Sequence, residues 1–227
     1  DDNLLVKGNT NSNGNIYGGW GDDSVEVVNN VNGDINLSVG DDRLAIGEDL
    51  NSSSDIHMGD GNDSVYVRAD LNGDIFMGND NDIVQVDGNV NDNGYIELGS
   101  GDDVAIFTGG YMNGNIYGKG GSDTVIIEGN VNSNGDVWMG SGDDTLVILG
   151  RISDADDIDG GDGTDSIYLG YYTVADYWND VDDIRSDITN FENIMLKDGV
   201  VKGNSFTYST GGSTYYSVSV DVTGLES

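Results

Sequence analysis

Short apolar stretches recur along the chain at an almost constant interval. Each starts at an Ile or Val that usually follows a Gly-Asp or Gly-Asn pair, and successive starts lie 19 to 21 residues apart. These starts are Ile16, Ile35, Ile56, Ile75, Ile96, Ile116, Val137 and Ile158. A unit of this length is too small to bury its own apolar face, so the pattern predicts similar units stacked on one another.

Within each unit the apolar positions predict three short strands. The first follows the Ile or Val start; the second alternates apolar and polar residues, as at Val65 and Val67; the third is a single apolar residue followed by Asn, as in Val31-Asn32. Gly and Asn turns separate them. We therefore expect an all-β fold, a parallel β-solenoid of about eight coils about 4.8 Å apart, with the asparagines stacked along one corner.

The periodicity ends after Gly170, which divides the chain into a solenoid over residues 1–170 and a C-terminal cap over 171–227. Apolar residues from Val174 to Ile188 recur in steps of three or four behind a candidate N-cap, Thr173, and predict a short amphipathic helix. Strand-like segments follow it. Such a cap would protect the last sheet edge from pairing with other chains.

The amino-acid composition argues against several classes of partner and site. The net charge is -34, with only 8 Lys plus Arg, which argues against nucleic acid or anionic membranes as partners. Cysteine is absent and His57 is the single histidine, so thiolate zinc sites are excluded and most catalytic routes lack residues. We find no apolar run of membrane-spanning length and no secretory signal peptide. Asp2, Leu4 and Val6 fit the repeat, so we expect the solenoid to continue upstream and this chain to be a monomeric fragment of a larger one.

An aspartate follows each strand start at a fixed offset of seven residues, at the end of a glycine-rich turn. The eight are Asp23, Asp42, Asp63, Asp82, Asp103, Asp123, Asp144 and Asp165. Glycines let a backbone turn aim its carbonyls inward, and Ca²⁺ takes six to eight carboxylate and carbonyl oxygens, which two stacked turns could supply. The alternative is that these acids are solvated turn residues, but a stacked column of carboxylates would repel itself strongly without cations.

The turns GGWGDDSVE and GGDGTDSIY match the form G-G-x-G-x-D-x-U-x, and here the chain resembles the repeats-in-toxin (RTX) family. The resemblance implies a calcium-binding β-solenoid in which these eight aspartates bridge neighbouring turns. It also implies roles for neighbouring acids and turn glycines: Asp22, Asp41, Asp102, Asp143, Gly21, Gly40, Gly61, Gly101, Gly121, Gly142 and Gly163. Asp80, Lys119 and the turn LSVGDD depart from the form. With one motif per coil, we expect a single file of about seven or eight Ca²⁺.

The segment NFENIML resembles an element that often follows RTX coils, and the Ser/Thr-rich tail is similar to the uncleaved signal of type I secretion substrates. These resemblances imply a non-catalytic, calcium-dependent folding module at the C-terminal end of a secreted or cell-surface RTX adhesin. Its partners would be calcium and, in transit, the type I secretion machinery. Acidic repulsion would keep the chain extended in the cytosol, and external calcium would fold it.

The sequence also allows other functions. Outward aromatic residues could stack on sugars; they are Tyr17, His57, Phe76, Tyr117 and Trp138, with Asn36 and Glu97 interrupting the row. Ice binding, known for some RTX adhesin solenoids, requires a flat threonine array. The outward positions Ser24, Arg43, Ser64, Ile83, Val104 and Thr124 do not supply one. The solenoid could also be the C-terminal domain of a secreted RTX enzyme. We expect no catalytic site in this chain, because its paired carboxylates would be occupied as ligands.

Overall fold

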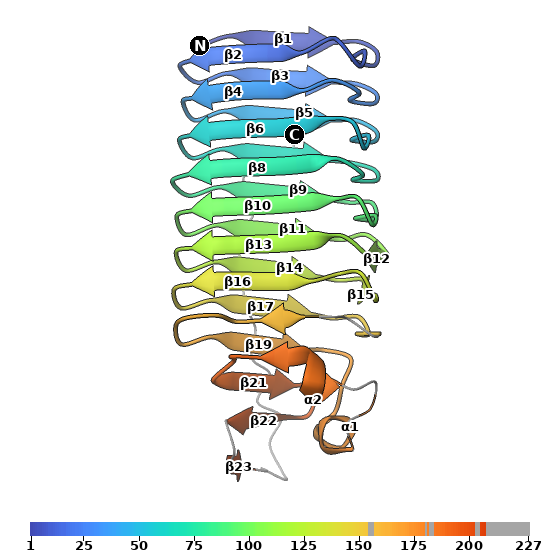
Figure 1. Cartoon of the computed structure of the whole chain (residues 1–227), viewed down its shortest axis with the longest axis vertical. Coiled ribbons are helices and arrows are strands. Elements are labelled where there is room, and N and C mark those ends of the chain that lie inside the picture. Colours follow the sequence, from blue (N-terminus) through green and yellow to red (C-terminus); the bar gives the residue numbers. More distant parts are fainter. Residues whose placement is uncertain (154–156, 180, 182–183, 203–204, 208–227) are drawn as a thin grey trace.

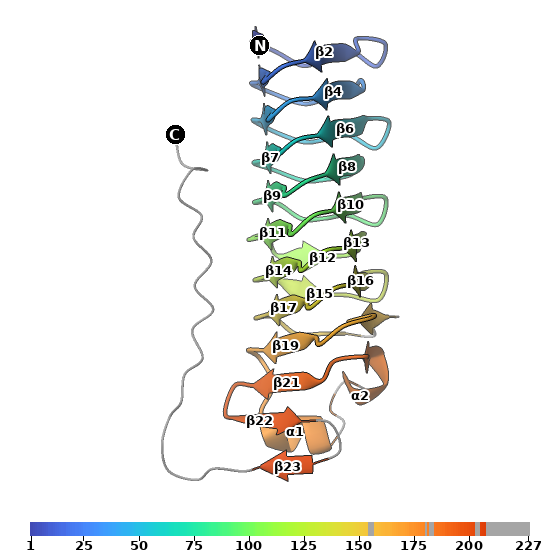
Figure 2. The ribbon, with the colours of Figure 1, turned by 90° about the vertical axis from the view of Figure 1, so that its left-hand side faces the viewer.

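The computed structural model describes residues 1–153, 157–179, 181, 184–202 and 205–207. The chain winds into a rod whose two long faces are parallel β-sheets, with one strand per coil on each face (Figures 1 and 2). The expected all-β parallel solenoid is confirmed.

The first sheet contains the strands that follow the aspartates. They are β1 (Asn3–Val6), β3 (Ser24–Val27), β5 (Arg43–Ile46), β7 (Ser64–Val67), β9 (Ile83–Val86), β11 (Val104–Phe107), β14 (Thr124–Ile127), β17 (Thr145–Ile148), β19 (Ser166–Leu169), β21 (Asn193–Leu196), β22 (Gly199–Lys202) and β23 (Ser205–Thr207). The last two pair antiparallel, and the tight turn at Lys197 and Asp198 joins β21 to β22.

The second sheet contains the strands that precede the glycine-rich turns. They are β2 (Ile16–Trp20), β4 (Ile35–Val39), β6 (Asp55–Asp60), β8 (Asp74–Asn79), β10 (Tyr95–Ser100), β13 (Asn115–Gly120), β16 (Val137–Ser141), β18 (Ile158–Asp159) and β20 (Ile188–Thr189). Equivalent starts pair directly, for example Ile35 with Ile56. The repeat interval read from the sequence is therefore the register of the sheet.

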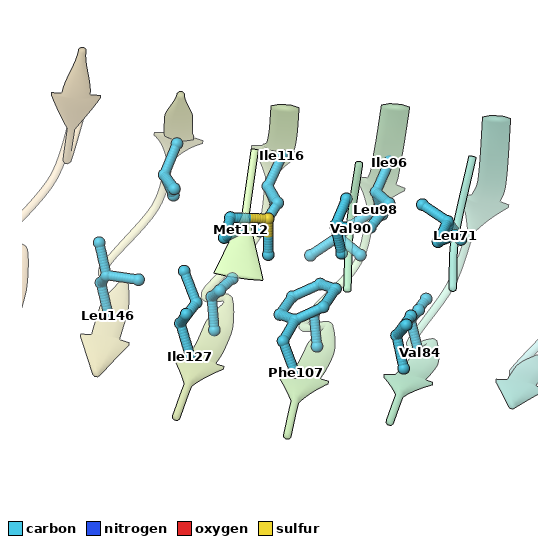
Figure 3. Packing of buried hydrophobic residues seen from close by; sticks show 14 of the residues in the cluster. Leu71, Val84, Val90, Ile96, Leu98, Phe107, Met112, Ile116, Ile127 and Leu146 are labelled. Carbon is cyan, nitrogen blue, oxygen red and sulfur yellow. The ribbon is translucent and has the colours of Figure 1, made fainter. Parts of the chain in front are cut away.

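The third apolar position of each coil forms the narrow side of the rod. Parallel bridges join Val31, Leu50, Leu71 and Val90 in turn, and the short strands β12 (Tyr111–Met112) and β15 (Asn130–Val131) continue them. Side chains from all three positions meet inside, as at Leu71, Val84 and Ile96, which have no exposed surface (Figure 3). The core is thus a set of apolar columns along the rod axis.

Asparagines follow this third position, and their predicted ladder forms only in part. Amide pairs join Asn51 to Asn32, Asn91 to Asn72, and Asn132 to Asn113 at 2.7–2.8 Å. The two asparagines of each pair are 19 residues apart in the sequence. The last asparagine of one pair and the first of the next are 21 or 22 residues apart. At that longer interval the donor changes target: Asn72 donates to the carbonyl of Leu50 at 3.3 Å. We call this corner, with these six residues, the asparagine edge.

The parallel stacking continues beyond residue 170. Strand β20 pairs with β18, and β21 pairs with β19, so residues 188–196 form one more, abbreviated coil (Figure 2). The single helix expected before it is two short helices, α1 (Val174–Trp178) and α2 (Ile184–Asp187). Thr173 is the N-cap of α1, in a capping box with Asp176.

None of the described helices has the length and apolar character needed to cross a membrane. The strand-like segment expected after Thr207 lies outside the described residues.

Candidate metal centre

The eight predicted aspartates form one buried column along the edge where the second sheet turns into the first. Each is at most 2 % exposed. Each accepts, through Oδ1, the backbone N–H of the residue one coil earlier in the column, at 2.6–2.9 Å. Asp2 donates the first of these bonds, so it also occupies the column position. We call this edge, with its eight aspartates, the aspartate edge.

The second carboxylate oxygen of every aspartate in the column has no protein partner. The Oδ2 atoms of all eight are buried and accept no hydrogen bond. A buried anionic oxygen without a partner is costly, and the column repeats that cost once per coil. Since Ca²⁺ prefers hard oxygen anions, these eight atoms fit the role of calcium ligands.

Burial makes the column electrostatically unfavourable without a cation. Desolvation, with smaller contributions from neighbouring carboxylates, raises the pKa of Asp82 to about 8 and that of Asp63 and Asp123 to about 7. The same causes raise the pKa of Asp103 and Asp144 to about 6. In the metal-free fold several of these groups would hold protons near neutral pH.

Each turn before an aspartate contains two residues with positive φ, at its second and fourth positions. The seven predicted turn glycines, Gly21, Gly40, Gly61, Gly101, Gly121, Gly142 and Gly163, all occupy the fourth position with φ between 101° and 159°. The departures noted in the sequence, Ser38, Asp80 and Lys119, adopt the same conformation, with φ of 80°, 74° and 77°. Three coils therefore form the turn at a steric cost.

At most of the glycine positions the turns also lie too close together for a side chain. A Cβ added at Gly61 would lie 2.0 Å from the carbonyl oxygen of Gly40, and one at Gly163 would lie 1.7 Å from that of Gly142. Turn carbonyls thus point along the stack toward the next coil. They are the additional oxygens that a calcium shell would need.

The carboxylates are distributed singly. Within the part of the chain that the structure describes, no three His, Cys, Asp or Glu side chains gather as a metal-binding group. An ion at this edge would therefore combine column carboxylates with backbone carbonyls from two turns, as the sequence predicts.

The neighbouring acids Asp22, Asp41, Asp102 and Asp143 lie on the outside of the same turns. They are exposed, and each Oδ1 accepts the backbone N–H of its counterpart in the next coil, at 2.8–3.0 Å. This outer ladder runs opposite to the buried one, in which the acceptor belongs to the later coil. The structure does not bring these four into the turn interior.

The outward aromatic residues form a continuous stack that the sequence pattern missed in one place. Tyr95 fills the gap at Glu97, so rings follow one another from His57 through Phe76, Tyr95 and Tyr117 to Trp138, with centroids 4.6–5.5 Å apart. Tyr17 stands apart and is 73 % exposed. The end pairs are stacked, with interplanar angles of 8° and 19°, and the inner pairs are tilted by 34–42°, so neighbouring rings cover much of one another's faces.

A ninth carboxylate continues the column where sequence reasoning placed none. The Asp165 N–H donates to Glu192 Oε2 at 2.8 Å, the same type of bond that joins the aspartates. The signal was present in NFENIML, but its offset differs from that of the repeats.

Comparison with known proteins places this geometry in a family. A family model described as bacterial antifreeze protein repeat matches residues 157–208. A solved structure, a hyperactive, Ca²⁺-dependent, β-helical antifreeze protein from an Antarctic bacterium, is 31 % identical with a TM-score of 0.69. The alignment covers 92 % of this chain and 70 % of that one. No curated protein matches.

Proposed function

The chain belongs to the family of bacterial Ca²⁺-dependent β-helical antifreeze proteins, and on that premise we propose that it is a non-catalytic module that folds by binding a row of calcium ions. One observation carries the proposal: eight buried Oδ2 atoms without a partner, one per coil, beside carbonyls that face the next turn. About seven or eight ions along the aspartate edge would give each of these oxygens a partner.

The ions would supply folding energy as well as ligands. Two carboxylates about 5 Å apart repel by about 3 kcal/mol at an effective dielectric constant of 20. A divalent ion between them replaces that repulsion with attraction to both. Since the unfolded chain has no such sites, the binding free energy becomes folding free energy.

We place the module outside the cell, as part of a secreted or surface RTX adhesin exported by type I secretion. The net charge of -34 would keep the chain extended where calcium is scarce. Extracellular calcium sites bind at about 0.1–1 mM, which suits a chain that folds after export. The same calcium requirement would apply if the parent were a secreted enzyme, so activity of the full-length parent would distinguish the two.

Circular dichroism with and without a chelator tests the calcium-dependent fold. We expect the β-sheet signal to require calcium and to return when calcium replaces EDTA. Metal analysis of the purified protein should give about seven or eight ions per chain. A sample chelated above about pH 8, where these carboxyls are ionised, that kept its sheet signal would contradict the proposal. A stoichiometry of one or two would contradict it as well.

Ice binding is the second candidate, because the matched structure is that of an antifreeze protein. The outer ladder of the aspartate edge provides regular polar positions at the coil spacing. Its members are Asp22, Asp41, Asn62, Asn81, Asp102, Ser122, Asp143 and Thr164. The column beside it is irregular, since Trp20, Val39 and Gly120 occupy equivalent places.

Partition of the calcium-loaded protein into growing ice tests this second function. If the outer ladder binds ice, Asn81→Tyr should abolish partition. Glu128→Tyr should not, because Glu128 follows β14 at the end of that strand away from the ladder. Exclusion of the wild-type protein from ice would remove this candidate and leave the calcium module intact.

Carbohydrate binding loses its geometric support. A sugar stacks on the face of a ring, and in the row from His57 to Trp138 neighbouring rings cover much of one another's faces. We assign the row a packing role on the outside of the second sheet. Glycan binding that disappeared in Trp138→Ala would overturn this assignment.

A further inference from the structure

The abbreviated coil at residues 188–196 repeats the aspartate edge with a different turn. Pairing aligns Thr189 with Asp159 and Asn193 with Ser166, which places Glu192 opposite Asp165. Between these anchor points the chain has only three residues, where the preceding full coil has six. Glutamate, longer by one methylene group, stands where every full coil has aspartate.

Glu192 makes the bond that defines the column. Its Oε2 accepts the Asp165 N–H at 2.8 Å, just as Asp165 Oδ1 accepts the Asp144 N–H at 2.8 Å. The longer side chain thus brings a carboxylate to the end of the column although its turn is shorter. The carboxylate is therefore retained at the end of the column, although the backbone of this turn follows a different path from that of the full turns.

Two oxygens, one of them without a partner, lie beside Gly160 between this turn and the last full one. A Cβ added at Gly160 would lie 2.3 Å from the Asn190 carbonyl oxygen and 3.0 Å from Asp165 Oδ2. Asp165 is fully buried, and its Oδ2 accepts no hydrogen bond.

An internal turn shows the same arrangement. A Cβ at Gly118 would lie 2.1 Å from the Met139 carbonyl oxygen and 2.5 Å from Asp123 Oδ2. The Asn190 carbonyl therefore takes the place of the Met139 carbonyl. Asn190 adopts φ of 58°, the left-handed conformation that the full turns also use.

We propose that the turn Thr189–Glu192 closes the column as one further calcium site, in which Glu192, Asp165 and the Asn190 carbonyl are ligands. This inference rests on the calcium-dependent fold proposed above. A hydrogen-bond acceptor alone would satisfy the Asp165 N–H, and glutamine could provide it. A carboxylate is needed only if a cation is to be held between the last coil and the cap.

The experiment counts calcium ions on the folded chain by native mass spectrometry at saturating calcium. Glu192→Gln keeps an acceptor for the Asp165 N–H and removes the charge, and we expect it to bind one ion fewer than the wild type. Glu128→Gln makes the same chemical change on an exposed residue at the far end of β14 and should bind the full number.

An equal ion count in wild type and Glu192→Gln would overturn the terminal site while leaving the other sites in place. A wild-type chain that bound no calcium would instead refute the proposed function. Should Glu192→Gln fail to fold, anomalous diffraction from wild-type crystals grown with terbium decides. A peak between Asp165 and Glu192 supports the site, and peaks only between full turns reject it.

Discussion

The aspartate edge and the asparagine edge repeat at the same coil spacing, yet they satisfy their side chains differently. On the asparagine edge, an amide contains both a donor and an acceptor, so Asn51 bonds directly to Asn32 at 2.8 Å. On the aspartate edge, a carboxylate contains only acceptors, so Oδ2 remains without a partner in every coil. Paired amides on the neutral edge satisfy one another within the protein, whereas the charged edge leaves one anionic oxygen per coil without a protein partner.

The same coil stacking can therefore either pair side chains with one another or create sites for a cation. Amides that pair with one another form the same bonds whether or not calcium is present. Side chains that repel one another make folding conditional on a cation. The proposed calcium dependence therefore lies on one edge of the rod, and four experiments test that assignment.

Changing pH without calcium acts on the whole aspartate edge and should have the largest effect. The folded carboxyls have pKa values of about 6 to 8, above the ordinary 3.8, so the folded chain holds protons that the unfolded chain has lost. Stability should therefore fall as pH rises from about 4 through about 8. Thermal melts of chelated protein measure this.

With saturating calcium the slope should reverse, because protons compete with the ions at low pH. Identical pH profiles with and without calcium would show that the aspartate edge does not bind it.

Asp123→Asn alters one position in the middle of the column. Asparagine keeps an acceptor for the Asp103 N–H but loses the anionic oxygen. In calcium we expect a loss of about 3 kcal/mol, by analogy with removing one partner of a buried ion pair. In EDTA at neutral pH the same change should stabilise any residual fold, since one buried charge is gone. Denaturant titration in both conditions measures the sign, and a loss of equal size in both would contradict a metal role.

Asn51→Asp introduces an acid on the asparagine edge. The amide bond to Asn32 is lost, and we expect destabilisation of about 1 kcal/mol, typical of one hydrogen bond. Calcium should not restore it, because the backbone around Asn51 has none of the positive-φ residues that form the turns of the aspartate edge. A calcium-dependent recovery would mean that charge alone, without the turn geometry, creates a site.

Asp80→Gly should have the smallest effect and the opposite sign. Asp80 has φ of 74° at a position where the other turns have glycine. Removing this conformational strain should stabilise the folded protein by about 1 kcal/mol. Melting temperature in saturating calcium measures it, with Asp60→Gly as an exposed control on the preceding turn. An unchanged melting temperature would mean that the strain is relieved elsewhere.

Much of the fold could be predicted from periodic residues. The interval from Ile16 to Ile158 sets the coil, the fixed offset to aspartate sets the turn, and the alternation in Val65 and Val67 sets the inward face. These features depend on local spacing, which a sequence displays directly. The deviations at Ser38, Asp80 and Lys119 were also visible, and they are the positions where the structure stores backbone strain.

The contacts made by residues outside the repeat emerged only from the three-dimensional fold. Glu192 reaches the aspartate column because a turn three residues shorter is compensated by a longer side chain, and Tyr95 enters the aromatic row from a neighbouring position. The amides pair in twos because loop length alternates between coils. The coil length, the position of the turn and the inward face could all be predicted from the sequence, because each repeated residue has the same neighbours in every coil. The contacts of Glu192, Tyr95 and the paired amides depend on distances between coils, and a fixed sequence offset does not predict those distances.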